Sequence, residues 1–154
     1  MVGRFRRRIT GILLVLYVAF VCVITLSPRM PGASTTNRLV RRVLAELHER
    51  GILTWVTFLH VEFVANILMF VPLGLLTALA LHRRWWWTLL FLGTAFSAVI
   101  ELCQLLLLPG RYSEVRDIVS NSIGFLIGAG VAVLLRLLIA HRDRLVIAEA
   151  RAAR

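Results

Sequence analysis

The sequence predicts an all-α integral membrane protein, a four-transmembrane-helix bundle with an outer interfacial amphipathic helix between helices one and two. Hydrophobic residues make up 59% of the 154 residues and the mean hydropathy is +0.83, whereas soluble domains are about 45–50% apolar. Four apolar runs are long enough to cross a bilayer. The net charge is +10, and most of the arginines lie outside these runs.

Composition also limits the class of protein. The apolar content excludes a disordered chain. The charge alone would suit a nucleic-acid binder, but the hydropathy does not, so we expect the lipid membrane, and no nucleic acid, as partner. The length predicts a single domain over 1–154. Cys22 and Cys103 lie in apolar runs and are expected to be small buried residues without a redox role.

The first predicted span covers about 9–26, follows four arginines near the N-terminus and ends before Ser27-Pro28. A signal peptide is the alternative, but the run is longer than a usual signal core and a good cleavage site is missing, so an uncleaved helix is expected. The other spans are predicted over about 63–81, 85–108 and 118–140.

Arginine counts predict the orientation. With both termini inside, the inner segments 1–8, 82–84 and 141–154 hold ten arginines, and the outer segments 27–62 and 109–117 hold seven. This bias favours an N-in and C-in protein with a cytoplasmic tail over 141–154. Trp85, Trp86 and Trp87 follow two arginines and are typical of an anchor at the inner face.

The loop after the first span contains a predicted amphipathic helix over about 37–50. Val40, Val43, Leu44 and Leu47 share one face, charged residues share the other, and Gly51 can end the helix. Such a helix can lie on the outer membrane surface. A loop helix that covers the mouth of the bundle is an equal alternative.

Polar residues interrupt three of the spans. A carboxylate at the bilayer centre costs about 3 kcal/mol, so it usually faces the bundle interior and has partners. Spacing places Glu101 on one helix face with Gln104, and Asp117 on one face with Asn121. Gly124 and Gly128 continue that second face, where small residues let a neighbouring helix approach closely.

In the predicted orientation these positions converge on the outer half of the membrane. The sequence therefore predicts one ligand-binding site, which comprises Asn66, Glu101, Gln104, Arg111, Asp117 and Asn121. The alternatives are a structural network, in which Arg111 neutralises Glu101 or Asp117, and catalysis. His60 and Glu62 form only an H-x-E pair, and the zinc motif H-E-x-x-H and the G-x-S-x-G elbow are absent. We expect no metal and no cofactor, and favour a non-enzymatic role.

Four motifs in order carry a resemblance to a known family. They are Tyr17 with Thr25-Leu26-Ser27-Pro28; Asn66, Phe70, Pro72 and Gly74; Glu101 with Gln104; and Gly110-Arg111 followed by Asp117, Asn121, Gly124 and Gly128. Over about residues 12–138 the chain resembles the VanZ-like family of small membrane proteins. That family is named for an accessory protein of glycopeptide-antibiotic resistance, and this named member is associated with resistance to teicoplanin. The family pattern has two acidic positions before the last helix. Glu114 and Asp117 fill them here, although Glu114 departs from the usual Asp and is the weaker site candidate.

The resemblance implies a bacterial inner (plasma) membrane protein linked to antibiotic resistance or the cell envelope, with no agreed enzymatic activity. The leading hypothesis is that the outer pocket binds an amphiphile, either an envelope lipid or a lipidated glycopeptide antibiotic. Arg111 would supply a fork for phosphate or carboxylate. The alternatives are an intramembrane enzyme acting on a lipid-linked substrate and a small assembly partner or transporter component, in which the glycine face could bury against a second copy.

Overall fold

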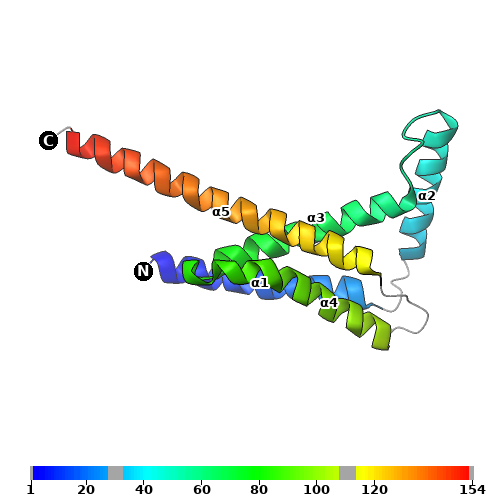
Figure 1. Ribbon diagram of the computed structural model, residues 1–154, viewed down its shortest axis with the longest axis horizontal. Coiled ribbons are helices and arrows are strands. Elements are labelled where there is room, and N and C mark those ends of the chain that lie inside the picture. Colours follow the sequence, from blue (N-terminus) through cyan, green and yellow to red (C-terminus); the bar gives the residue numbers. More distant parts are fainter. Residues whose placement is uncertain (1, 28–32, 108–113, 153–154) are drawn as a thin grey trace.

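The computed structural model describes residues 2–27, 33–107 and 114–152, and all regular structure in these segments is helical (Figure 1). The elements in chain order are α1 (Val2–Leu26), α2 (Ala33–Glu49), α3 (Phe58–Ala80), the 3₁₀-helix η1 (Arg83–Thr88), α4 (Leu89–Leu107) and α5 (Val115–Ala152). Four stretches, 7–26, 58–80, 84–107 and 115–152, are long and apolar enough to span a membrane. The prediction of an all-α chain with four such helices is confirmed.

The helices extend beyond most of the predicted spans. The first begins at Val2, the second at Phe58, and the fourth continues to Ala152. The prediction counted apolar residues, which mark the depth of the bilayer, whereas arginine and alanine are good helix formers and continue a helix into water. The third apolar stretch covers 84–107, within a residue of the predicted 85–108, but its first turns form η1 and α4 begins only at Leu89, in keeping with the use of 3₁₀ turns at helix starts.

The predicted helix in the first loop exists as α2, which lies crosswise to the bundle at one end (Figure 1). It ends where expected, because Gly51 has a positive φ of 71° and its amide donates to the His48 carbonyl at 2.9 Å. The guanidinium of Arg41 lies 4.1 Å from the ring centroid of Phe58 and so links α2 to the start of α3. Its placement on the membrane surface stays a prediction.

The closest packing in the bundle is the crossing of α3 and α5. A Cβ added at Gly124 would overlap the carbonyl of Ile67, and one at Gly128 would overlap the carbonyl of Val71. On the opposite helix, a Cβ at Gly74 would overlap the carbonyl of Phe125. The predicted close approach at Gly124 and Gly128 is thus present, and its partner is α3 of the same chain.

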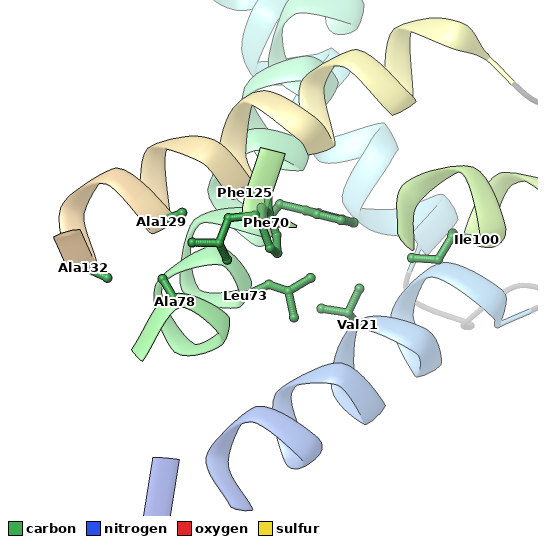
Figure 2. Packing of buried hydrophobic residues seen from close by; sticks show 9 residues of the cluster. Val21, Phe70, Leu73, Ala78, Ile100, Phe125, Ala129 and Ala132 are labelled. Atoms are coloured by element: carbon green, nitrogen blue, oxygen red, sulfur yellow. The ribbon is translucent and has the colours of Figure 1, made fainter. Parts of the chain in front are cut away.

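Around this crossing lies a small apolar core. Phe70 and Leu73 of α3 and Phe125 of α5 are buried, and Val21 of α1 points toward Leu73 (Figure 2). The Tyr17 hydroxyl donates to the Met69 carbonyl at 2.8 Å and adds a polar link between α1 and α3. Large apolar side chains on the outside of all four spans stay exposed, as expected of a bundle whose outer surface meets lipid.

The glycine crossing generates a stability prediction. Gly128→Ala places a methyl group against the Val71 backbone, so we expect it to lower the free energy of unfolding by about 1–3 kcal/mol. Gly130→Ala is the matched control, because nothing lies within 4 Å of its added Cβ. The control should be neutral or stabilising, by up to about 1 kcal/mol, since alanine favours helix. Thermal unfolding in nanodiscs measures both; equal melting temperatures for the two variants would contradict the packing account.

Candidate functional site

Polar side chains from three helices, α3, α4 and α5, gather at one end of the bundle. Helices α1 and α4 finish there, and α3 and α5 begin there (Figure 1). We call the following set the polar cluster: Asn66, Ser97, Glu101, Gln104, Asp117 and Asn121. Five of the six predicted site residues belong to it, and the sixth, Arg111, lies outside the described residues.

The deepest link in the polar cluster joins α4 to α5. Asn121 Nδ2 donates to Ser97 Oγ at 2.9 Å, and the two residues are only 4% and 0% exposed. The Asn121 Oδ1 atom is buried and has no hydrogen-bond partner in the described part of the chain. Because buried acceptors almost always have a donor, this oxygen marks a place for a water molecule or a ligand group.

A second link joins α4 to the end of α1. Gln104 Nε2 donates to the Thr25 carbonyl at 2.9 Å, and both residues are buried. The last four carbonyls of an α-helix have no donor from within the helix, and α1 ends at Leu26. Gln104 therefore caps α1, which explains why an amide is present at this depth.

Glu101 connects α4 to the start of α5. Its Oε2 accepts the backbone N–H of Glu114 at 3.3 Å, one residue before α5 begins, and the side chain is only 4% exposed. The N-terminal end of a helix carries partial positive charge and unpaired N–H groups, and both favour a carboxylate. Glu101 thus offsets part of its burial cost at the α5 terminus.

Asn66 and Asp117 tie α3 to α5. Asn66 Nδ2 donates to Asp117 Oδ1 at 3.1 Å, and both residues are partly buried. Asp117 lies in the first turn of α5, where the helix dipole favours its charge. Asp117 therefore combines a position at a helix terminus with a contact to another residue of the polar cluster.

At the rim of the polar cluster one arginine bridges two carboxylates. Arg116 approaches Glu62 at 3.1 Å and Glu114 at 2.9 Å, and its side chain is 28% exposed. The sequence places Arg116 beside acidic residues, but sequence reasoning missed its pairing with Glu62 across helices. The available signal was the four-residue spacing from Glu62 to Asn66, which puts both on one face of α3.

The H-x-E pair has separate structural roles. The Thr57 amide donates to His60 Nδ1 at 3.0 Å, so His60 caps the start of α3, while Glu62 pairs with Arg116. Within residues 2–27, 33–107 and 114–152, no three His, Cys, Asp or Glu side chains gather in a way that could hold a metal ion. The described site is therefore rich in carboxylates and amides, with Arg116 as its cation.

Comparison with known proteins gives one finding. The model of the VanZ/LLP1 family matches residues 13–136, which is most of the chain. The matched range contains every residue of the polar cluster and the glycines of the α3–α5 crossing. No curated protein and no solved structure shows a significant match.

The ion pairs generate a prediction. Arg116→Gln leaves two carboxylates without their shared cation. Because these carboxylates are 42% and 50% exposed, water screens their charge, and we expect a loss of about 0.5–1 kcal/mol in the free energy of unfolding. Arg50→Gln is the control: Arg50 also pairs with a glutamate, at 2.6 Å, but its side chain is 66% exposed, and such pairs contribute at most about 0.5 kcal/mol. Chemical or thermal unfolding in nanodiscs compares them. An Arg116 effect no larger than that of Arg50 would show that the bridge is not structural.

Proposed function

We propose that this protein, which belongs to the VanZ-like family, is a multi-pass protein of the bacterial plasma membrane whose polar cluster binds the head group of an amphiphile. The helices are long and apolar enough for four spans. The kind of ligand, the kind of membrane and the orientation of the helices are all part of what we propose. Its consequence for the cell would be a change in sensitivity to lipidated glycopeptides such as teicoplanin, or in the lipid composition of the envelope.

The observation that carries the proposal is the unfilled acceptor inside the polar cluster. Asn121 Oδ1 is buried without a donor among the described residues, and the Glu101 carboxylate lies at the same end of the bundle. Buried acceptors in proteins almost always receive a donor, whether from the protein, an ordered water or a ligand, and we assign this one to the ligand. The head group would therefore bring hydrogen-bond donors, such as hydroxyl or amide groups.

The same head group would carry an acid. Arg116 is already engaged by Glu62 and Glu114, so it is not the arginine that we assign to the ligand. We assign that role to Arg111, which the chain places between Glu101 and Asp117. A guanidinium can bind a phosphate or carboxylate through two parallel hydrogen bonds. An envelope lipid and a lipidated glycopeptide both combine such a group with donors and an apolar tail.

Orientation follows from the arginine bias. With N-in and C-in topology, the polar cluster faces the outer leaflet, and α2, which lies at the same end of the bundle (Figure 1), becomes an outer surface helix. Its apolar face would rest on the membrane. An amphiphile could then enter sideways from the outer leaflet with its tail still in lipid.

The first test of the proposal uses co-purified lipid. Glu101→Gln and Arg111→Ala each remove a charge that would contact the head group, so we expect an enriched lipid in native nanodiscs to fall about tenfold. Lipid mass spectrometry measures this loss, and teicoplanin susceptibility of cells that express each variant gives a second readout. Glu49→Gln is the control, because Glu49 is an exposed acidic residue of α2.

Two results would contradict the proposal. One is a wild-type protein with no enriched lipid and no effect on susceptibility. The other is normal expression and wild-type behaviour of both site variants. Thermal unfolding of each variant separates a lost ligand contact from a lost fold, since a folded variant that no longer retains lipid supports binding.

Orientation has its own test. Single cysteines replace Glu49 of α2 and Asp143 of α5 in a chain that carries Cys22→Ala and Cys103→Ala. An impermeant maleimide added to intact spheroplasts should label the cysteine at 49 and not the one at 143, because the proposed topology puts α2 outside. The reverse labelling pattern would place the polar cluster in the cytoplasmic half and exclude an outer-leaflet ligand.

A further inference from the structure

A hollow lined by several basic side chains lies at the end of the bundle opposite the polar cluster. A cavity of about 450 Å³ forms where the start of α1, the end of α3 and η1 meet. Its wall includes Arg7, Leu81, His82, Arg84 and Trp85. We call it the basic cavity. It lies outside the proposed function, because it shares no residue with the polar cluster.

The electrostatics of the basic cavity favour an anion. Two of its lining side chains are arginines, one is a histidine, and none carries a carboxyl group. The carbonyls at the end of α3 would ordinarily repel an anion, since they form the negative end of the helix dipole. The Arg136 side chain of α5 donates to two of these carbonyls, that of Leu79 at 2.9 Å and that of Leu81 at 3.4 Å. Its positive charge therefore offsets part of this repulsion.

The position of the basic cavity indicates a membrane lipid as the source of that anion. It lies where three of the apolar stretches, 7–26, 58–80 and 84–107, have their ends. Trp85 and the two tryptophans that follow it are exposed, as in the aromatic belts at membrane surfaces. The guanidinium of Arg84 lies 5.3 Å from the Trp85 ring centroid, which holds its charge at this level.

An apolar groove on α1 gives the acyl chain a place. It is lined by Gly11, Ile12, Val15 and Leu16, with Arg8 at one end. Nothing lies within 4 Å of a Cβ built on Gly11, so the helix surface is open there. Gly11 is one turn along α1 from Arg7, on the same face. The groove and the basic cavity share no lining residue, but Gly11 and Arg8 bring the groove beside Arg7, so a charged and an apolar surface lie next to each other for the two parts of one phospholipid.

We propose that the basic cavity binds the phosphate of an anionic phospholipid, with Arg7 and Arg84 as its ligands and Trp85 beside the glycerol region. Arginine forms bidentate hydrogen bonds to phosphate, and basic hollows between membrane helices are suited to anionic head groups. In the N-in orientation the lipid comes from the inner leaflet. The site would fix the depth of the bundle in the membrane.

The full chain is placed in phosphatidylcholine nanodiscs that contain a minor fraction of phosphatidylglycerol. Native mass spectrometry then measures how much phosphatidylglycerol stays bound to the protein. Loss of both cationic ligands in the double variant Arg7→Gln/Arg84→Gln should weaken retention about tenfold or more. The matched control is Arg142→Gln/Arg144→Gln, which removes the same charge from the exposed end of α5 and should retain the lipid. Equal loss in both double variants, or no loss in either, would overturn the proposal.

Two further measurements distinguish the lipid site from a free-phosphate site and from a purely structural role of the arginines. Excess inorganic phosphate should leave phosphatidylglycerol bound, and its displacement would show a free-phosphate site instead. Thermal unfolding in pure phosphatidylcholine should give the same melting temperature for wild type and Arg7→Gln/Arg84→Gln, while added phosphatidylglycerol should raise it only for wild type. A variant already unstable without phosphatidylglycerol would assign these arginines a structural role and contradict the lipid site.

Discussion

The contact of α3 with α5 without intervening side chains is the constraint on which the rest of the structure depends. Gly124 and Gly128 face carbonyls of α3, and Gly74 faces a carbonyl of α5. A helix pair that meets backbone to backbone has little freedom to slide or rotate, because any shift brings a side chain into the contact. This register puts Asn66, the residue before Ile67, within hydrogen-bond distance of Asp117, about two turns before Gly124. The α3–α5 crossing thus holds one side of the polar cluster.

Two α4 side chains of the polar cluster contact the ends of other helices. Gln104 caps the end of α1, and Glu101 accepts the amide before α5. These two buried side chains therefore each have a backbone partner at or beside a helix terminus, where a membrane helix would expose backbone groups that lipid cannot satisfy. Asn121 departs from this pattern, because its oxygen has no donor among the described residues. The Asn121 oxygen is therefore the atom from which we argue the proposed ligand site.

Much of this arrangement could be predicted from sequence, and the reasons are physical. Apolar runs of bilayer length identify four helices that are long enough to span a membrane, and alternating helix direction brings polar residues of α3, α4 and α5 to one end. The helix ends were less predictable, since Val2 and Ala152 lie in charged segments that continue a helix without being apolar. Pairings such as Arg116 with Glu62 depend on helix rotation and on the path into α5, which residue spacing alone does not specify. The role of Gln104 depends on where α1 ends, so its partner is a backbone carbonyl that no side-chain motif reveals.

The central claim is that the polar cluster recognises a head group and does more than join four helices. The most direct measurement is a high-resolution cryo-electron microscopy map of the protein in nanodiscs formed from its own membrane. The account predicts head-group density within hydrogen-bond distance of Asn121 Oδ1, continuous with an acyl chain that leaves the bundle toward lipid. A map in which Asn121 Oδ1 accepts only from water or from a side chain of the protein, with no lipid density at the polar cluster, would contradict it.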